Sequence, residues 1–248
     1  MNWQRQIKRQ LSGGHGFSAQ SLSVTRTIIF INLILFTLMV LHGTVAGLQM
    51  RAIMNPPVAL LLHWGGQLWQ PLVLQADQWW RCVTYAFTHG GLIHLAFNMI
   101  VLYQVGSRLE FEIGRPAFIN LYFITAITGT LAGLLWHPHT PVVGASTSLF
   151  GLIGFSVMYY HRIGTSIAIS MRNFMFQWAV FAFIFGLLVG ADNAGHLGGA
   201  VGGVLLGMLM PVISTRQRAI EPALRTTAWV CVVLTGLSFV GMVFAWFQ

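Results

Sequence analysis

The sequence has very few charged residues. Only 7% of its 248 residues are Asp, Glu, Lys or Arg, whereas about a quarter of the residues of a soluble domain are charged. Hydrophobic residues make up 56% of the chain, and the mean hydropathy is +0.71. Soluble domains, disordered chains, coiled coils and disulfide-rich secreted modules are excluded, because they need charged residues, heptads or cysteines that are absent here. A helical membrane protein that crosses the bilayer several times remains.

Cysteine is almost absent as well. Cys82 and Cys231 lie far apart and match no metal-binding or redox spacing, so we interpret both as packing residues. No motif for a metal, a nucleotide or a flavin is visible; we therefore expect no cofactor, no metal and an activity that chelators do not affect. The formal net charge is +8, but the basic residues are scattered singly between apolar blocks. We therefore expect no nucleic-acid partner.

Seven apolar stretches are long enough, or nearly long enough, to cross a bilayer as helices, which takes about 20 residues. They are approximately residues 27–48, 91–109, 117–136, 146–160, 173–190, 194–213 and 226–247. The fourth is short. The first follows basic residues but has too long an apolar run for a cleaved signal peptide, so we interpret it as a retained anchor. The sequence predicts an all-α, polytopic membrane protein.

The basic residues predict how the chain is oriented, because cytoplasmic loops retain Lys and Arg during insertion. With the N-terminus inside, eleven of the thirteen basic residues fall in inside segments, and only Arg51 and Arg81 fall outside. We predict an integral, multi-pass protein with a cytoplasmic N-terminus and an external C-terminus. In a bacterium it would lie in the cell (inner) membrane.

The loop from about 49 to 90 is too long for a simple connector. It holds four of the nine tryptophans, a residue that prefers the membrane interface. We expect this loop to lie in the outer leaflet, with turns at Asn55-Pro56-Pro57 and Gly65-Gly66.

Polar side chains inside membrane spans are costly, so each is a candidate functional residue. His94 and Asn98 are four residues apart on the second span and share one helical face; alone, they are as well explained as an interhelical hydrogen-bond pair. Ser146, at the start of the fourth span, would by itself be read as a cap or packing residue. His196 opens the sixth span beside two glycine ridges. Such ridges let helices approach closely. They are Gly195, Gly199 and Gly203, and Gly198 with Gly202.

The predicted topology brings these residues to one level. The second, fourth and sixth spans all run from outside to inside, and His94, Ser146 and His196 lie near their N-terminal ends. Polar residues with independent structural roles would scatter across depths. A cluster at one depth, just below the outer surface, is what a buried hydrolytic site requires.

The residue types fit nucleophilic catalysis. A serine hydroxyl needs an adjacent base, and imidazole suits that role at neutral pH, so we assign Ser146 as nucleophile and His196 as general base and acid. His94, Asn98 and the backbone N–H of Ser146 can stabilise the oxyanion. Asp192 is the one carboxylate near the site and could orient His196. We favour a dyad, because packing against Phe150, one turn after Ser146, can fix the imidazole instead.

At these residues the chain resembles the rhomboid intramembrane serine proteases. The motifs that match are Trp80-Arg81 in the first loop, His94 and Asn98 on the second span, Gly144 and Ser146 on the fourth, and His196 with Gly199 on the sixth. The resemblance covers the family's six-helix core, from about residue 25 to 213. Residues 226–247 resemble the extra C-terminal helix of seven-helix members.

This resemblance implies a Ser–His dyad that cleaves transmembrane protein substrates, which enter sideways from the lipid bilayer. It also implies that Trp80 and Arg81 are structural and that Glu110 with Gly106 supports the inner end of the second span. We divide the chain into a cytoplasmic tail (1–25), a six-helix catalytic core (26–213), and a cytoplasmic linker with the seventh helix (214–248).

One residue departs from the family pattern. Thr147 follows Ser146 where members usually have glycine, and a β-branched residue there narrows the backbone's options. The oxyanion geometry or the room for substrate is expected to differ.

Two other functions stay open at this point. One is a non-catalytic rhomboid-like protein that binds membrane helices. The other, a channel or transporter, is disfavoured because the inner halves of the spans are apolar and polar residues are not spread across the membrane depth.

Overall fold

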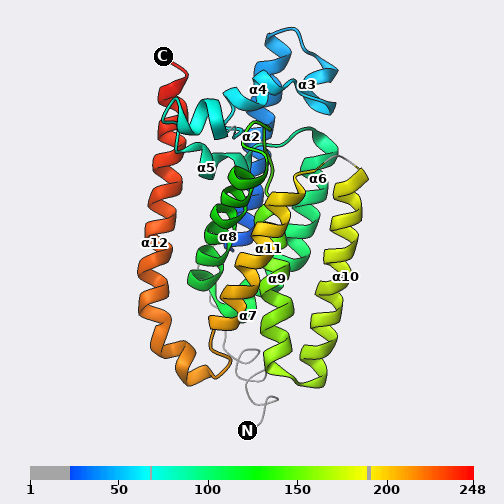
Figure 1. Cartoon of the computed structure of the whole chain (residues 1–248), viewed down its shortest axis with the longest axis vertical. Coiled ribbons are helices and arrows are strands. Elements are labelled where there is room, and N and C mark those ends of the chain that lie inside the picture. Colours follow the sequence, from blue (N-terminus) through cyan, green and yellow to red (C-terminus); the bar gives the residue numbers. More distant parts are fainter. Residues whose placement is uncertain (1–22, 68, 189–190) are drawn as a thin grey trace, which may run out of the picture.

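The protein is a bundle of helices. The structure, a computed structural model, describes residues 23–67, 69–188 and 191–248, so most of the predicted tail lies outside the described residues. Long helices run side by side, and short helical segments gather at one end (Figure 1). The described residues form no strand; an isolated bridge joins Gln67 and Val142. The predicted all-α class is confirmed.

Each predicted span corresponds to one long helical segment. These segments are α2 (Val24–Val45), α6 (Leu92–Val101) continuing through a π-helical stretch (Leu102–Gly106) into α7 (Ser107–Ile113), α8 (Arg115–Trp136), α9 (Ser146–Ile163), α10 (Ser166–Leu188), α11 (Asn193–Leu209) and α12 (Ser214–Ala245). Two boundaries differ from prediction. Helix α10 starts well before residue 173, and α12 includes most of the predicted linker, which is helical through Pro222.

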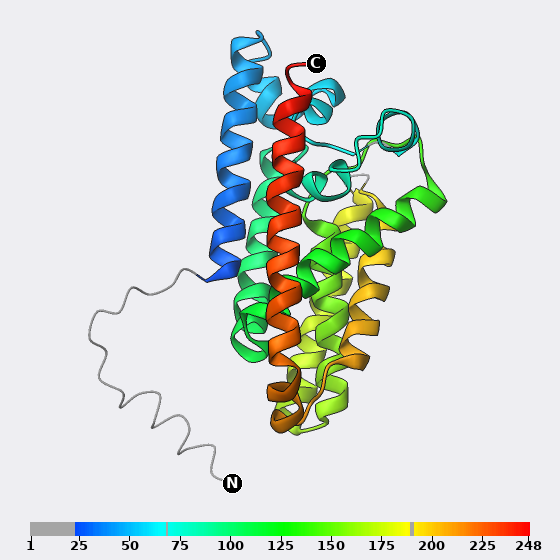
Figure 2. The same cartoon turned by 90° about the vertical axis from the view of Figure 1, so that its left-hand side faces the viewer.

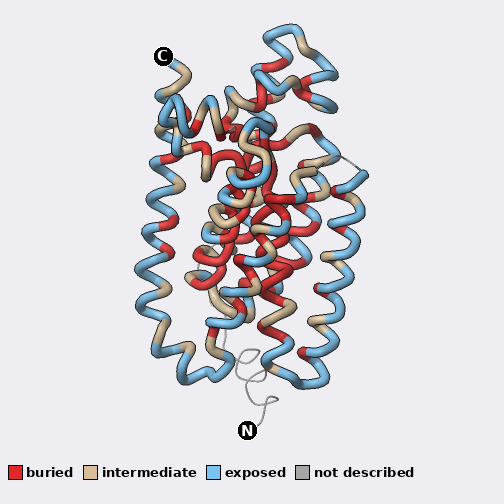
Figure 3. Tube along the Cα trace, viewed as in Figure 1, coloured by how far each residue is buried: buried red, intermediate tan, exposed pale blue. Residues whose placement is uncertain are grey.

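Five of these segments are long and apolar enough to cross a membrane: α2, α6 with α7, α8, α10 and α12. Helices α9 and α11, of 18 and 17 residues, are not among them. Helix α9 lies inside the bundle, where burial is greatest (Figure 3), and α11 packs against it while keeping one exposed apolar face. Protein covers most of α9 and the glycine faces of α11, and small residues on these faces let the helices pack closely.

The two ends of the bundle differ in charge. We call the end at which α2 begins the basic end; eight of the ten arginines in the described residues lie near it, and they are Arg26, Arg108, Arg115, Arg162, Arg172, Arg216, Arg218 and Arg225. We call the opposite end the loop end. It carries α3 (Met50–Met54), α4 (Val58–His63), a π-helical turn (Trp69–Leu74), α5 (Arg81–Thr84) and a 3₁₀ turn (Tyr85–Phe87).

The glycine ridges of α11 bring backbones into contact, as predicted. A Cβ on Gly199 or Gly203 would collide with the carbonyl oxygens of Thr147 or Gly151 on α9. A Cβ on Gly198 would lie 2.5 Å from the Ala132 side chain of α8. The first ridge therefore packs on α9 and the second on α8, and α11 lies tightly between them.

Arg81 ties the first loop together. Its Nη1 donates to the carbonyl oxygens of Leu62 (2.6 Å) and Gly66 (2.5 Å), and its Nε donates to Gln78 (2.6 Å). The guanidinium also lies 4.3 Å from the ring centre of Trp80. Burial lowers the pKa of Arg81 to about 10, so it stays charged at neutral pH. The predicted turns are present, between α3 and α4 and at Gly65, whose φ is +97°.

Glu110 holds the start of α2. Its carboxylate accepts from the backbone N–H groups of Val24 (2.8 Å) and Thr25 (2.9 Å) and from the Ser23 hydroxyl (3.0 Å). Gly106 lies beside it, where an added Cβ would be 3.2 Å from the Thr25 methyl group. The sequence-based interpretation was that this pair supports the second span. The contacts show that it joins that span to α2.

Candidate active site

Ser146 and His196 meet at the loop end. Ser146 is the first residue of α9, and His196 lies in the first turn of α11. Their side chains form a hydrogen bond of 2.8 Å between Oγ and Nε2. When the hydroxyl donates, Nε2 is unprotonated and Nδ1 carries the imidazole hydrogen. Close packing of α9 on α11 makes this pairing possible between residues 50 positions apart.

Aromatic packing holds the imidazole of His196. The ring of Phe150 stacks on it with a centroid distance of 4.3 Å and an interplanar angle of 20°. Gly186 of α10 also packs against the imidazole, since a Cβ there would lie 3.3 Å from it. Nδ1 of His196 is buried and has no hydrogen-bond partner among the described residues. The contacts that hold this ring among the described residues are therefore the Phe150 stack, the packing against Gly186 and the hydrogen bond to Ser146.

Asp192 is engaged elsewhere. Its Oδ1 accepts from the backbone N–H of Gly195 (2.9 Å) and thereby caps the start of α11. The same oxygen lies 2.6 Å from Nε2 of His137, which follows α8. The carboxylate therefore joins the ends of two helices, and no hydrogen bond joins it to the His196 imidazole in the described residues.

His94 and Asn98 lie beside the segment that leads into Ser146. A Cβ on Gly144 would be 2.8 Å from Nε2 of His94 and 3.5 Å from Nδ2 of Asn98. Gly144 has a φ of +117° and donates its N–H to the carbonyl of Tyr85 (2.9 Å). Both the backbone conformation and the close approach of His94 require glycine here.

The hydrogen bonds of His94 assign its tautomer. Its Nδ1 accepts from the N–H of Gly90 at 3.3 Å, so in the neutral ring Nε2 carries the hydrogen. This Nε2–H lies near Gly144, and Nδ2 of Asn98 is buried without a partner among the described residues. The N–H of Ser146 has no acceptor within α9, because it belongs to the first turn of the helix. Three donors therefore lie around the segment 144–146.

Thr147 packs away from this group of donors. Its side chain is buried between α8 and α11, where its methyl group faces Gly129 and its hydroxyl lies 3.3 Å from the position of a Cβ on Gly195. The missing side chain of Gly129 makes the room that the threonine methyl needs. The sequence alone did not indicate this partner, because Gly129 lies within the regular apolar pattern of α8.

The Thr147–Gly129 contact predicts a coupled pair of substitutions. We expect Gly129→Ala to destabilise the protein, because the new methyl group would collide with the Thr147 methyl group. Thr147→Ser removes that methyl group and is expected to restore at least about 1 kcal/mol in the double variant, within the range for residues in contact. Thermal unfolding of the two single variants and the double variant measures this coupling. Additive effects would contradict the assigned contact.

Sequence reasoning missed three residues near the site. Tyr85 accepts from the Gly144 N–H, His137 binds Asp192, and Gly186 faces His196. They come from separate segments and share no motif. In the part of the chain that the structure describes, no group of three or more His, Cys, Asp or Glu side chains can hold a metal ion.

Comparison with known proteins matches the central and C-terminal parts of the chain to one family model. The family model described as Rhomboid domain matches residues 76–212. The chain is 36% identical over 140 residues to rhomboid protease GluP of Bacillus subtilis, and this match covers 53% of the chain and 26% of that protein. It is 32% identical over 157 residues to RHOMBOID-like protein 4 of Arabidopsis thaliana, and this match covers 62% of the chain and 40% of that protein.

A further relative is named as inactive. The chain is 30% identical over 156 residues to Inactive RHOMBOID-like protein 8 of Arabidopsis thaliana, and the match covers 62% of the chain and 44% of that protein. The matched part thus spans between about a quarter and a half of the length of these three relatives.

Proposed function

The chain belongs to the rhomboid family, and on that premise we propose that it is an intramembrane serine endopeptidase with a Ser146–His196 dyad. Its substrates are proteins with transmembrane segments, cleaved near the extracytoplasmic face. The observation that carries the proposal is the 2.8 Å hydrogen bond between Ser146 Oγ and His196 Nε2. A nucleophile and its base must lie within this reach.

The reaction follows from the roles of these two side chains. His196 Nε2 takes the proton of Ser146 as Oγ attacks the scissile carbonyl carbon. The protonated imidazole then gives that proton to the leaving amine, and an acyl-enzyme remains. Water, deprotonated by the same imidazole, hydrolyses the ester and regenerates the serine.

The tetrahedral intermediates need donors for their oxyanion. We assign this role to Nε2–H of His94, Nδ2 of Asn98 and the backbone N–H of Ser146. Gly144 supports it because its lack of a side chain keeps the space beside His94 open. A single donor of this kind typically contributes about 3 kcal/mol to the stability of the transition state.

Active-site labelling tests the proposal directly. A fluorophosphonate probe should modify the purified protein at Ser146, because only an activated serine reacts. Labelling should disappear in Ser146→Ala and in His196→Ala. Absence of labelling in folded wild-type protein would instead support a non-catalytic relative that binds membrane helices, the alternative that similarity to an inactive family member also allows.

Because Asp192 contacts Gly195 and His137 rather than His196, we predict that its carboxylate is dispensable for the chemistry. We expect Asp192→Asn to keep kcat within about tenfold of wild type, because the amide oxygen can still cap α11. The variant is measured on the same transmembrane substrate as His196→Ala. If both variants lose activity to the same degree, the mechanism is a triad.

We place the lateral entry of substrate between α6 and α10. Phe97 of α6 stacks on Phe185 of α10, with 4.1 Å between the ring centroids. The ring of Phe181, also on α10, lies 5.7 Å from Phe97, again between centroids. These rings join two helices that both pack against α9. A transmembrane substrate that comes from the bilayer on this side must separate them.

Removing this aromatic contact should ease entry. We expect Phe185→Ala to raise the cleavage rate of a transmembrane substrate several-fold and to leave cleavage of a short soluble peptide unchanged. Phe183→Ala, an exposed phenylalanine on the same helix, is the matched control. An equal increase for both substrates would contradict this route.

We further propose that the basic end is cytoplasmic and the loop end external. The arginines at the basic end support this orientation. In a variant with Cys82→Ser and Cys231→Ser, a membrane-impermeant thiol reagent added to intact cells should label Thr140→Cys at the loop end and leave Thr165→Cys at the basic end unlabelled. The reverse pattern would invert the topology.

A further inference from the structure

The first turn of α11 carries His196, the base of the proposed dyad. In the part of the chain that the structure describes, two side-chain hydrogen bonds join this turn and its N-cap residue to the rest of the bundle. One is the bond between His196 and Ser146, and the other is a contact of 2.6 Å between His137 and Asp192. The closest backbone contacts of α11 with α9 lie farther along the helix, at the glycines after His196. The position of the imidazole therefore depends on what holds the start of α11.

A single oxygen of Asp192 binds two groups. Its Oδ1 accepts from the backbone N–H of Gly195 (2.9 Å) and lies 2.6 Å from Nε2 of His137. Because an ionised carboxylate only accepts hydrogen bonds, Nε2 of His137 carries a hydrogen and donates it. Both side chains are largely shielded from water, with 22% of the His137 side chain and 14% of the Asp192 side chain exposed. The contact therefore connects the end of α8 to the first turn of α11.

The contact with Asp192 also orients His137. Nδ1 of His137 is buried and has no hydrogen-bond partner among the described residues, so Nε2 makes the polar contact of this ring. His139, two residues later, is exposed, and its side chain makes no hydrogen bond within the described part of the chain. The two neighbouring histidines thus differ in their contact with α11, and His139 offers a matched control.

The first loop anchors the end of α8 that carries His137. Helix α8 crosses the bundle obliquely, so that its last turns reach the loop end beside the segment Trp69–Leu74 (Figure 2). There Nε1 of Trp69 donates to the carbonyl of Thr130 (2.7 Å), and the N–H of Gln70 donates to the carbonyl of Pro138 (2.9 Å). These bonds hold the chain on both sides of His137.

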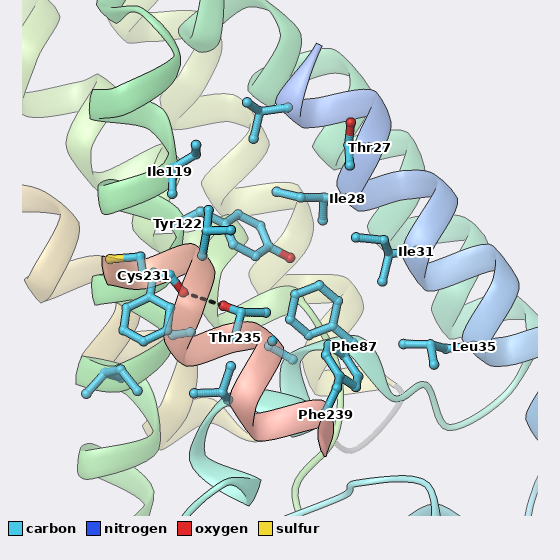
Figure 4. Close-up of a pocket in the computed structure, with 18 of the residues that line it drawn as sticks. Thr27, Ile28, Ile31, Leu35, Phe87, Ile119, Tyr122, Cys231, Thr235 and Phe239 are labelled. Carbon is cyan, nitrogen blue, oxygen red and sulfur yellow. Dashed lines mark hydrogen bonds between the residues drawn. The ribbon is translucent and has the colours of Figure 1, made fainter. Parts of the chain in front are cut away.

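The middle of α8 has different surroundings. Together with α2 and α12 it lines an apolar cavity of about 550 Å³ (Figure 4). The lining residues of α8 all lie between Ile119 and Ile127, before the part of the helix that the first loop holds. The support for His137 therefore comes from the loop end rather than from α2 or α12.

We propose that His137 is a positioning residue for the reaction proposed above, on which this inference rests. Through Asp192, His137 holds the first turn of α11 so that Nε2 of His196 stays within hydrogen-bond reach of Ser146. The support runs from the first loop to the end of α8, then to Asp192 and α11. Without it the first turn moves relative to α9, and the distance between hydroxyl and imidazole increases.

This role separates the carboxylate charge of Asp192 from its hydrogen bonds. The amide oxygen of Asp192→Asn still accepts from Gly195 and His137, so this variant keeps the support and stays active. Asp192→Ala removes the acceptor and should lose as much activity as loss of the His137 donor. In a triad, by contrast, Asp192 would act on His196 directly and His137 would be dispensable.

Two variants of nearly equal size test the donor. The side-chain amide of His137→Gln donates to Asp192, whereas His137→Glu places a second carboxylate there. We expect His137→Glu to lower both kcat for a transmembrane substrate and the rate of fluorophosphonate labelling at least about tenfold, because misplacing catalytic groups by about 1 Å can cost 10²-fold. His137→Gln should stay within about threefold of wild type, and KM should change less than about twofold in both variants, because His137 does not bind substrate.

Controls separate position from charge and folding. His139→Glu makes the same change of charge at the exposed neighbour and should match wild type. His137→Leu removes the donor without adding a charge and should show the same losses as His137→Glu, and it replaces His137→Glu if that variant does not fold.

Hydrogen exchange of the start of α11 gives a readout that needs no cleavage. Amides of the peptide that contains Gly195 and His196 should exchange faster in His137→Glu than in wild type and His137→Gln. Equal labelling rates in the Gln and Glu variants, or faster exchange without loss of labelling, would overturn the positioning role. Absence of labelling in folded wild-type protein would instead refute the protease function, so the two failures are distinguishable.

Discussion

Ser146→Ala is expected to lower kcat for cleavage of a transmembrane substrate by about 10⁴-fold or more, because no other group replaces the nucleophile. His196→Ala should lose a similar factor, since the hydroxyl of Ser146 then has no base at 2.8 Å. The double variant should lose little more than either single variant, because the two side chains act as one unit. Single-turnover cleavage in liposomes measures all three.

The matched control is another buried serine of α9. The hydroxyl of Ser156 donates to the Leu152 carbonyl at 2.8 Å, two turns or more from the candidate site. Ser156→Ala should therefore cleave the substrate at close to the wild-type rate. If folded Ser146→Ala protein cleaved the substrate at the wild-type rate, the proposed mechanism would be wrong.

Gly199→Ala is expected to destabilise the protein strongly, as would Gly203→Ala, whose added Cβ would collide with the carbonyl oxygen of Gly151. The Cβ added at Gly199 would collide with the carbonyl oxygen of Thr147, and a backbone atom cannot move aside without moving α9. Overpacking of this kind costs about 3 kcal/mol, which corresponds to a melting temperature roughly 6 to 12 °C lower. Thermal unfolding in detergent measures the effect, and loss of fluorophosphonate labelling should accompany it because α11 carries His196.

The control for this substitution is a glycine without neighbours. A Cβ on Gly236 of α12 meets nothing within 4 Å. Gly236→Ala should leave stability unchanged or raise it by about 0.5–1 kcal/mol, because alanine restricts the unfolded chain and favours the helix. Similar destabilisation by both substitutions would show that close approach of α9 and α11 is not the cause.

Much of the fold could be predicted because its signals are local. Low charge and long apolar runs predicted the membrane helices, and the glycine spacing on α11 predicted two close helix contacts. Helix ends were less predictable. The segment from Arg216 to Arg225 contains four charged residues and Pro222, so the seventh span was predicted to begin after it, yet the backbone of α12 is helical throughout this segment.

Part of the candidate site was also visible in the sequence. Ser146, His196, His94 and Asn98 stand out because polar groups are costly in a membrane span, and their place at helix starts predicted a common level. Their roles stay predictions until variants are assayed. The partners of Thr147 and Asp192 were not visible, because Gly129 and His137 lie on other segments and belong to no motif.

The sequence by itself determined that this is an all-α membrane protein and which polar residues are candidates for chemistry, because hydropathy and residue type are properties of the chain alone. Only the tertiary structure decided that Asp192 binds His137 rather than His196, that Phe150 stacks on the imidazole, and that Gly129 makes room for Thr147. It alone revealed an apolar cavity of about 550 Å³ lined by α2, α8 and α12. The physical reason is that these contacts depend on how closely and at what angle helices pack, and helices distant in sequence carry no local record of that packing.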